Sequence, residues 1–337
     1  MLAGFTINYK CTYTHKYTKL SSYWVIDNSK KVHESINTIN LQHRAKSVNS
    51  YDFSTLYTMI PHDKLLQRIR IVTEMAFGIS GKSYLRINKS NATWAAKLPA
   101  KSNMVYYNID TLMNDIKFLL SNLYILHNEK LFRQVIGIPI GSDCSQDLAN
   151  LFLFSYEHEH VDALMESGHE DADLLGHSHR YIDDLLVLND MGYIDRMYQE
   201  IYPSELVLNK TNTDDTMANY LDLEISREGN RFTTKLFDKR NDFSFKVISL
   251  PHLKSCVPSR CSYGVFTSQV LRLLRVNSAI SGFYADVKQL INKLCKQGYV
   301  RNRLIYYLNK FLCTRFYEIV CKYWDIVDIK QFSQGTE

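Results

Sequence analysis

The chain lacks any hydrophobic run long enough to cross a membrane. None of its apolar stretches approaches the roughly 20 residues that a spanning helix needs. The first ten residues do not place a basic segment before an apolar one, so we expect no signal peptide. These absences predict an intracellular protein, nuclear or cytoplasmic and not secreted, without a membrane partner. The 337 residues contain no internal repeat and suffice for a sizeable core and two subdomains.

Cysteine shows no pattern of a disulfide framework or a zinc site. The seven cysteines are an odd number, and no two of them form a C-x-x-C pair: Cys11, Cys144, Cys256, Cys261, Cys295, Cys313 and Cys321. This scatter fits a reducing compartment. The pairs His158/His160 and His177/His179 have no partners at metal-ligand spacing, so we interpret them as surface histidines.

Acidic residues are scarce in one part of the chain. The net charge is only +5, but residues 264–322 contain ten basic residues against Asp286 and Glu318. The basic residues are Arg272, Arg275, Lys288, Lys293, Lys296, Arg301, Arg303, Lys310, Arg315 and Lys322. A basic C-terminal module suggests a polyanionic partner. From charge alone, a solvated helix face remains an equal alternative.

Two adjacent carboxylates, Asp183 and Asp184, stand between two apolar runs in the segment from Arg180 to Leu188. This pattern predicts a β-hairpin with a tight Asp-Asp turn. Adjacent carboxylates repel, and a hard divalent cation would offset their charge. An ordinary hairpin turn is the alternative, since aspartate is a common turn residue.

The remaining pattern predicts a chain of mixed helices and strands. We expect a strand over 47–57, a helix from 64 to 72 with Asp63 as N-cap, and an irregular insertion over 79–104. Further along, the spacing predicts helices over 112–126, 145–166 and 191–201, strands over 220–225 and 232–237, and basic helices from about 265.

Three features then occur in order: Asp52 on the first strand, the glycine loop from Gly137 to Ser142, and the acid pair. Asp52 and Asp183 are 131 positions apart, so only a tertiary fold can bring them together. The chemistry that needs such a cluster is nucleotidyl transfer, in which two Mg²⁺ ions (or Mn²⁺) clamp the attacking and leaving oxygens of a phosphoryl displacement.

These segments resemble the motifs of reverse transcriptases. The run from Asp52 to Leu65 resembles motif A, Gln134–Ser142 with Leu148–Leu151 resembles motif B, and Arg180–Leu186 resembles motif C. Later segments, which include Tyr220–Leu223 and 258–269, resemble a eukaryotic retroelement branch close to the Penelope-like elements. The resemblance covers roughly residues 24 to 320.

The resemblance implies an α+β right-hand polymerase fold, with an antiparallel palm sheet, partial fingers and a helical thumb. We expect a remnant of the fingers over 1–46, a palm over 47–263 with a fingers insertion at about 66–150, and a basic helical thumb over 264–337. It also implies template RNA or DNA, a DNA primer and deoxynucleoside triphosphates as partners. The oligomeric state is left open.

The resemblance also assigns roles to individual residues. The implied metal ligands are Asp52, Asp183 and Asp184, and the implied nucleotide-binding residues are Phe53, Tyr57, Gly137 and Gly141. Tyr57 occupies the steric-gate position, with a core tyrosine as the alternative. Lys210 lies near the position of a lysine that protonates pyrophosphate, with a solvated loop lysine as the alternative. The implied nucleic-acid contacts are Arg272, Arg275, Lys293, Lys296, Arg301 and Arg303.

The sequence departs from the family pattern in three places, one of which is Met59, where a small or polar residue is usual. No segment before Ser47 matches the fingers motif that grips the triphosphate, and Ser145-Gln146 replaces the usual Ala-Pro of motif B. We therefore expect a truncated and impaired RNA-directed DNA polymerase domain with poor triphosphate affinity. The alternative is a non-catalytic, nucleic-acid-binding remnant of a retroelement polymerase.

Overall fold

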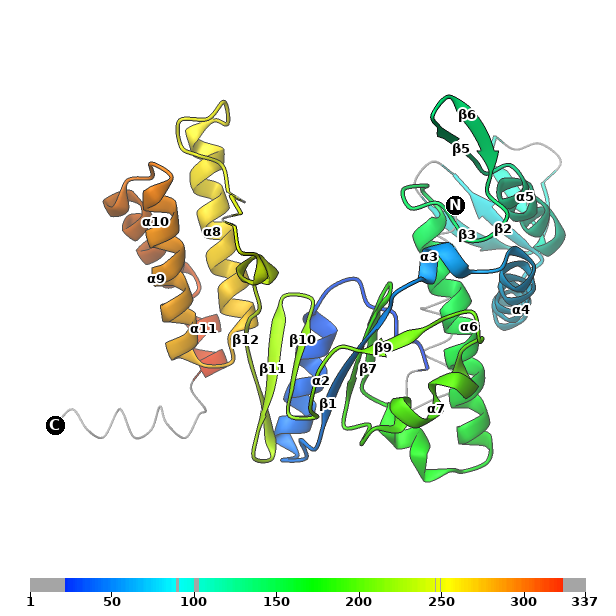
Figure 1. Cartoon of the computed structure of the whole chain (residues 1–337), viewed down its shortest axis with the longest axis horizontal. Coiled ribbons are helices and arrows are strands. Elements are labelled where there is room, and N and C mark those ends of the chain that lie inside the picture. Colours follow the sequence, from blue (N-terminus) through cyan, green and yellow to red (C-terminus); the bar gives the residue numbers. More distant parts are fainter. Residues whose placement is uncertain (1–21, 89–90, 100–102, 246, 249, 324–337) are drawn as a thin grey trace. The chain divides into compact units, whose positions relative to one another are not determined.

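The computed structural model describes residues 22–88, 91–99, 103–245, 247–248 and 250–323 (Figure 1). The chain divides into two compact units. The first unit comprises Met1–Ser35 and Lys46–Asp215, and the second comprises Ile36–Ala45 and Thr216–Glu337. None of the helices in the described ranges is long and apolar enough to cross a membrane.

The helix α2 (Lys30–Leu41) begins in the first unit and ends in the second. The other elements described in the first unit are β1 (Val48–Phe53), α3 (Leu56–Met59), α4 (His62–Ser80), β2 (Tyr84–Ile87), β3 (Ala92–Ala95), β4 (Val105–Tyr107), α5 (Ile109–Ser121), β5 (Tyr124–His127), β6 (Lys130–Arg133), α6 (Ser145–Glu166), η1 (Glu170–Leu175), β7 (Ser178–Tyr181), β8 (Asp184–Leu188), α7 (Tyr193–Ile201) and β9 (Leu208–Lys210).

The first unit is built on an antiparallel four-stranded sheet in the order β7-β8-β1-β9. Side chains alternate between the two faces of a strand. Tyr51, Phe53, Leu185 and Val187 therefore share one face, and all four are buried in the core to which α6 contributes Leu148 to Phe154. The other face is buried as well, by Val48, Leu186 and Leu188, so that in β1 and β8 only Asp52 and Asp184 at the strand ends are partly exposed.

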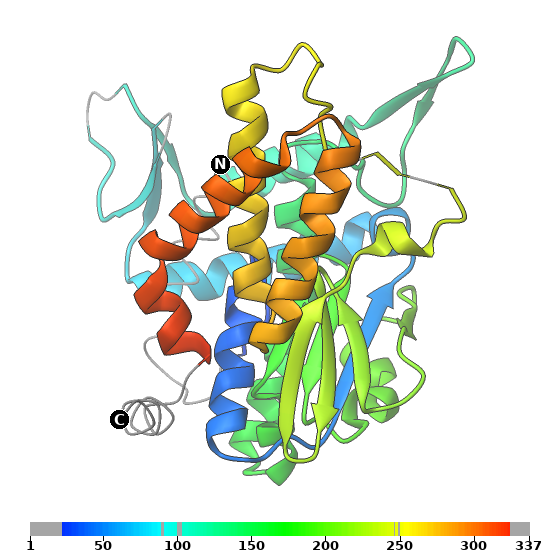
Figure 2. The same cartoon turned by 90° about the vertical axis from the view of Figure 1, so that its left-hand side faces the viewer.

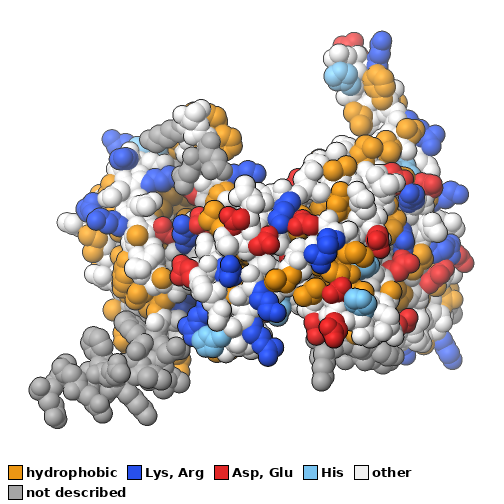
Figure 3. Space-filling model, turned by 60° about the horizontal axis from the view of Figure 1, so that its bottom comes forward, with side chains coloured by type: hydrophobic (Ala, Val, Ile, Leu, Met, Phe, Trp, Pro, Cys, Tyr) orange, Lys and Arg blue, Asp and Glu red, His pale blue; other side chains and the backbone are white. Residues whose placement is uncertain are grey.

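Two smaller sheets complete the first unit. β2 pairs with β3 and β4, and β5 pairs with β6 in a separate hairpin. The side chains of the β5–β6 hairpin are exposed along both strands, including Leu126 and Leu131. Figure 3 shows this hairpin projecting from the surface, with hydrophobic side chains below a charged tip.

The second unit combines a three-stranded sheet with four helices. Its elements are β10 (Met217–Tyr220), β11 (Leu223–Glu228), β12 (Arg231–Leu236), η2 (Lys239–Asp242), α8 (Ser259–Val276), α9 (Ile280–Lys296), α10 (Arg301–Thr314) and α11 (Phe316–Tyr323). The strands are antiparallel in the order β10-β11-β12. Figure 2 shows α8, α9 and α10, drawn yellow to orange, packed side by side; their apolar faces form a separate core around Phe266, Phe283 and Leu304.

Several expected elements are confirmed. The predicted helices over 145–166 and 191–201 correspond to α6 and α7, and the predicted acid hairpin to β7 and β8. The strand predicted over 232–237 is β12, and the helix predicted over 112–126 is α5, which ends earlier, at Ser121.

Other expectations are wrong. Residues 79–104 are not irregular, because β2 and β3 lie within them. The N-cap of α4 is Pro61 rather than Asp63, which lies in the first turn, where a carboxylate still favours the positive end of the helix dipole. The strand predicted over 47–57 ends at Phe53, and the one predicted over 220–225 is broken by a turn at Leu221, whose φ is 54°.

Candidate active site

The sheet of the first unit places two of the predicted acids directly opposite each other. Asp52 at the end of β1 pairs with Asp184 at the start of β8. Directly opposed residues point to the same face, with Cβ atoms about 4.5–5.5 Å apart. Both side chains are partly exposed, at the face opposite the buried Tyr51 and Leu185. Like charges at such positions are destabilising, so this pair favours a cation.

The third acid lies in the hairpin turn beside this pair. Tyr181 pairs with Asp184, so the two turn residues are Ile182 and Asp183 and not the two aspartates that we expected. The Phe53 backbone N–H donates to the Asp183 carbonyl oxygen at 3.1 Å, which ties the turn to the end of β1. Ile182 has a φ of 59°, in the left-handed region that a β-branched residue rarely occupies.

A buried ionic network contacts the turn through the Ile182 carbonyl oxygen, and it was not predicted from the sequence. The Arg180 guanidinium donates through Nε to Glu157 Oε1 at 2.6 Å and through Nη2 to Glu157 Oε2 at 3.1 Å. Its Nη1 donates to Asn150 Oδ1 and to the Ile182 carbonyl oxygen, both at 2.9 Å. The Tyr202 hydroxyl donates to Glu157 at 3.1 Å.

The electrostatics of this network follow from its burial. Both Arg180 and Glu157 have fully buried side chains. Burial works to lower the pKa of Arg180, but the charge and hydrogen bonds of Glu157 outweigh it and the pKa is raised. No clear signal in the sequence pointed to this network, because Glu157 is followed by the polar residues His158, Glu159 and His160 and only the fold shows which of them is buried.

Tyr57 lies close to the acids. It follows β1 in the short helix α3 and packs, half-buried, against the core of the first unit. Burial, followed by the charge of Asp183, raises the pKa of the Tyr57 phenol. The Tyr57 ring thus lies within range of the Asp183 charge, and its role as a gate stays a prediction.

The glycine loop closes onto the segment that carries Tyr57. The Ile138 N–H donates to the Tyr57 carbonyl oxygen at 2.7 Å, and the Gly137 N–H donates to the Ile60 carbonyl oxygen at 2.8 Å. A Cβ on Gly137 would lie 2.4 Å from the Tyr57 carbonyl oxygen, and φ at Gly137 is +76°. Gly137 is therefore required for close backbone packing, whereas Gly141, at φ +100°, faces open space.

Lys210 is not brought together with the acids. It pairs with Tyr51 in the β1–β9 register, so its side chain points to the sheet face opposite that of Asp52. Its ammonium group donates to Asp195 at 2.8 Å and to Asp215 at 3.0 Å. Burial works to lower the pKa of Lys210, but these two carboxylates raise it. Asn209 is the β9 residue opposite Asp52.

The six predicted nucleic-acid contacts lie on three helices of the second unit: Arg272 and Arg275 on α8, Lys293 and Lys296 on α9, and Arg301 and Arg303 on α10. Arg275, Lys296, Arg301 and Arg303 are exposed. Arg272 is held by Asp222 through an ion pair of 2.8 Å, and the Arg303 guanidinium stacks on Tyr263 at 4.6 Å from the ring centre.

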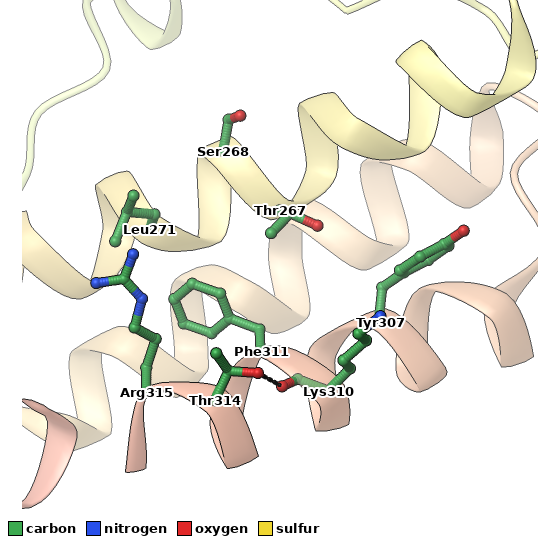
Figure 4. Close-up of a pocket in the computed structure, with 8 residues that line it drawn as sticks. All are labelled: Thr267, Ser268, Leu271, Tyr307, Lys310, Phe311, Thr314 and Arg315. Carbon is green, nitrogen blue, oxygen red and sulfur yellow. Dashed lines mark hydrogen bonds between the residues drawn. The ribbon is translucent and has the colours of Figure 1, made fainter. Parts of the chain in front are cut away.

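A pocket of about 420 Å³ lies between α8 and α10 (Figure 4). Thr267, Ser268 and Leu271 line it from α8, and Tyr307, Lys310, Phe311, Thr314 and Arg315 line it from the other side. Of the two cations that line it, Arg315 is already ion-paired with Glu318 at 2.6 Å. The Thr314 hydroxyl is already bonded to the Lys310 carbonyl oxygen at 2.7 Å.

The histidine interpretation is wrong for two of the four residues. His158 and His179 are buried, not on the surface. His158 contacts Ser22 and Asp162 and stacks on Phe154, and His179 lies 2.9 Å from the Ser35 hydroxyl. Burial lowers the pKa of both rings, because it disfavours the charged form.

The three acids suit a hard divalent cation by donor type. Carboxylate oxygens are the ligands that Mg²⁺ and Mn²⁺ prefer, and Asp52 and Asp184 share one sheet face beside the Asp183 turn. The side chains are not closed around a common point: within the described ranges, no three His, Cys, Asp or Glu residues form a group that could hold a metal ion. The oxygen donors are of the type that the ion prefers, and Asp52, Asp183 and Asp184 are the residues that would supply them.

Comparison with known sequences gives no family. No family model matches the chain, and no curated protein matches it either.

Solved structures do share its fold. Telomerase from Candida albicans, in complex with a TWJ fragment of telomeric RNA, matches with a TM-score of 0.52 and 14% identity over 96% of this chain and 49% of that chain. Apo telomerase from Candida tropicalis matches with a TM-score of 0.50 and 10% identity over 96% of this chain and 52% of that chain. The chain thus spans about half the length of these proteins, and at such low identity the likeness establishes the fold alone.

Proposed function

We propose that this chain is an RNA-directed DNA polymerase domain that extends a DNA primer by two-metal nucleotidyl transfer. The observation that carries the proposal is the pairing of Asp52 with Asp184, with Asp183 in the adjoining turn, in a chain whose overall fold is similar to that of telomerase. Telomerase is itself an RNA-directed DNA polymerase. The motif sequences further favour a retroelement origin, in the order A, B and C.

The acids would supply the ligands for the metal ions. Asp52, Asp183 and Asp184 would hold Mg²⁺ or Mn²⁺ by their carboxylate oxygens. When bound, the ions would offset charge on the triphosphate and on the attacking and leaving oxygens of the displacement. The sheet contributes by holding two of these acids in register, so that little reorganisation of the backbone is needed when substrate arrives.

Tyr57 and the glycine loop would shape the nucleotide site. The Tyr57 ring lies near Asp183 and stays neutral, so it acts through its bulk, as a barrier to a ribose 2′-hydroxyl. Gly137 holds the loop against the Tyr57 and Thr58 carbonyls and so fixes the position of that ring. Gly141, which faces open space, leaves the loop backbone accessible to a nucleotide or template.

The second unit would bind the nucleic acid through its phosphates. The exposed side chains of Arg275, Lys296 and Arg301 carry positive charge on three different helices. Contacts of this kind read the backbone and its shape rather than the base sequence. In the right-hand arrangement that we propose, the basic helical segment over 264–337 is the thumb, and the palm over 47–263 contains the β7-β8-β1-β9 sheet.

Primer extension tests the proposal directly. The full chain is incubated with an oligo(dT) primer on poly(rA), dTTP and Mg²⁺ or Mn²⁺. We expect incorporation that falls at least about 100-fold in Asp183→Asn, because even partners of metal ligands cost 10–100-fold when replaced. The matched control is Asp173→Asn, which makes the same chemical change at an exposed residue of η1. Binding of primer–template without incorporation under either metal would contradict the proposal and favour a non-catalytic nucleic-acid-binding protein.

A metal titration checks the ligands without turnover. Mn²⁺ should raise the melting temperature of the wild-type chain and not that of Asp52→Asn, since an ion that binds only the folded state stabilises it by about 2.7 kcal/mol at 100 times its Kd.

A further inference from the structure

The hairpin turn that carries Asp183 is held in a conformation that its residues do not favour. Only the first of its two residues, Ile182, has a positive φ, which is the pattern of a type II′ turn. Such turns prefer glycine at that position. With a β-branched side chain there, Cβ crowds the following carbonyl, so the conformation persists only where the surroundings enforce it.

Two hydrogen bonds enforce it, one on each carbonyl of the turn. The Asp183 carbonyl accepts from the Phe53 N–H at 3.1 Å, and the Ile182 carbonyl accepts from Arg180 Nη1 at 2.9 Å. The first bond is a backbone contact between the turn and the last residue of β1. The second comes from the buried side chain of Arg180, which is also bound to Glu157 and Asn150.

Arg180 is itself fixed from every side. Its backbone N–H donates to the Trp24 carbonyl oxygen at 2.7 Å, and its carbonyl accepts from the Ile26 N–H at 2.9 Å. Its guanidinium is held on two edges by Glu157 and Asn150 of α6. The donor that reaches Ile182 is therefore preorganised, and it links the turn to the long helix of the core.

We propose that Arg180 is a positioning residue for the acid pair: its buried guanidinium holds the Ile182–Asp183 turn in the conformation that keeps Asp183 beside the end of β1. Glu157 and Asn150 act through Arg180 by fixing the direction of its donors. The catalytic consequence rests on the proposed polymerase function. The geometric claim stands on the hydrogen bonds alone.

The second unit contains a matched turn that serves as an internal control. Leu221 and Asp222 also form a two-residue turn with a positive φ, of 54°, at the first position. The Asp222 carbonyl accepts from the Phe237 N–H at 3.0 Å, as Asp183 accepts from Phe53. There, however, the arginine contact is made by Arg272 to the Asp222 carboxylate, so changes at Arg180 should leave this turn untouched.

The variant that tests the proposal removes the network without leaving a buried charge. In Arg180→Met/Glu157→Met/Tyr202→Phe the ion pair is replaced by apolar side chains of similar size, a change that is often neutral for stability. Amide hydrogen exchange then reports on the two turns. We expect exchange of the Phe53 amide to become at least tenfold faster and that of the Phe237 amide to be unchanged.

Turnover gives the second readout. We expect kcat of the triple variant to fall at least tenfold while its affinity for primer–template is unchanged, because the nucleic-acid contacts lie on other residues. Tyr202→Phe alone, which keeps the contact between Arg180 and Ile182, should retain the wild-type kcat. Adding Ile182→Gly to the triple variant should recover part of the lost kcat, because glycine adopts the type II′ position without strain.

Wild-type exchange at Phe53 together with wild-type kcat in the triple variant would overturn the proposal and leave Arg180 a purely structural ion pair. Should the triple variant not fold, Arg180→Lys takes its place with the same readouts, since lysine keeps the charge beside Glu157 but lacks the fork of donors. If the wild-type chain incorporates no nucleotide, the proposed function fails while the Phe53 amide still decides the role of Arg180.

Discussion

At the scale of single residues, the acid hairpin combines features that cost stability. Asp52 and Asp184 are like charges in direct opposition, and Ile182 adopts a left-handed backbone. Each such feature costs of order 1 kcal/mol. These costs lie together at one end of one sheet, next to the buried Arg180. Clustering of this kind is typical of functional sites, where geometry and not stability is the constraint.

His179 gives the chain a dependence of stability on pH. Burial, followed by the positive charges of His177 and Lys31, lowers the pKa of His179 to about 3. The unfolded chain, with a pKa near 6.5, therefore binds a proton that the folded chain does not. The free energy of unfolding is unaffected by His179 above pH 6.5 and falls by about 1.4 kcal/mol per pH unit below it.

Chemical denaturation at several pH values measures this effect. Between pH 6 and 4, His179→Gln should have a shallower loss of stability than the wild-type chain, because glutamine does not titrate. The control is His127→Gln, at an exposed position of β5, which should follow the wild-type slope. Parallel curves for wild type and His179→Gln would show that the His179 ring is protonated equally in both states.

At the scale of elements, prediction from the sequence worked best where apolar residues recur at regular spacing over a long segment. The helix from Ser145 to Glu166 was predicted with correct bounds, because its apolar spacing is regular. The hairpin was predicted in the right place, but its turn lies one residue earlier than expected, at Ile182 and Asp183. The strands β2 and β3 were missed, since four-residue strands between Gly, Ser, Asn and Lys residues carry too short a period to be recognised.

The sequence predicted that Asp52 and the acid hairpin meet in one antiparallel sheet, and the pairing of β1 with β8 confirms this. The direct opposition of Asp52 and Asp184 was not foreseen, and the metal-binding role of the acids stays a prediction. Lys210 went to the opposite face, since its side-chain direction depends on the register of β9, which local sequence does not fix. The contact between Arg180 and Glu157 spans 23 positions and depends on how the sheet packs on α6.

The two glycines of the loop before α6 should respond differently to the same substitution. Gly137→Ala would place a Cβ 2.4 Å from the Tyr57 carbonyl oxygen and 2.8 Å from that of Thr58, so backbone must move. Gly141→Ala meets nothing within 4 Å and bears only the cost of a left-handed backbone, about 1–2 kcal/mol. We expect Gly137→Ala to lower the free energy of unfolding by more than Gly141→Ala does.

Urea denaturation of the two variants gives this comparison. If Gly137→Ala loses more nucleotide incorporation than its loss of folded protein explains, the effect lies at Tyr57. Equal destabilisation by the two substitutions would mean that the loop is not packed against α3 as the structure has it.

At the scale of the whole molecule, the proposed catalytic residues and the proposed nucleic-acid contacts lie in different units. The first unit carries the acids, Tyr57 and the glycine loop, and the second carries the basic helices. Charge counting along the sequence located the basic module, but it could not tell engaged cations from available ones. Asp222 neutralises the charge of Arg272, and Arg303 is exposed but stacked on Tyr263. Arg275, Lys296 and Arg301 are exposed without an ion pair among the described contacts, although Arg301 donates to the neutral Asn292 at 3.2 Å.

This distinction predicts which cations set the salt dependence of nucleic-acid binding. Each cation that contacts a phosphate releases counterions. Removing one such cation should therefore make the slope of log binding constant against log salt concentration less negative by about 0.9. We expect that reduction for Arg275→Gln, Lys296→Gln and Arg301→Gln, with no change in sequence preference, because phosphate contacts carry no base information. The changes should add in the triple variant, since the three side chains lie on separate helices.

Binding of a labelled primer–template duplex, measured from low to high salt, provides the slopes. Lys82→Gln removes the same charge from an exposed residue of the first unit and serves as the matched control, with the wild-type slope expected. Arg272→Gln should change the slope less than Arg275→Gln, because Asp222 already neutralises the Arg272 guanidinium. If Lys82→Gln and Arg275→Gln lowered the slope equally, binding would reflect the net charge of the chain and not a basic face of the second unit.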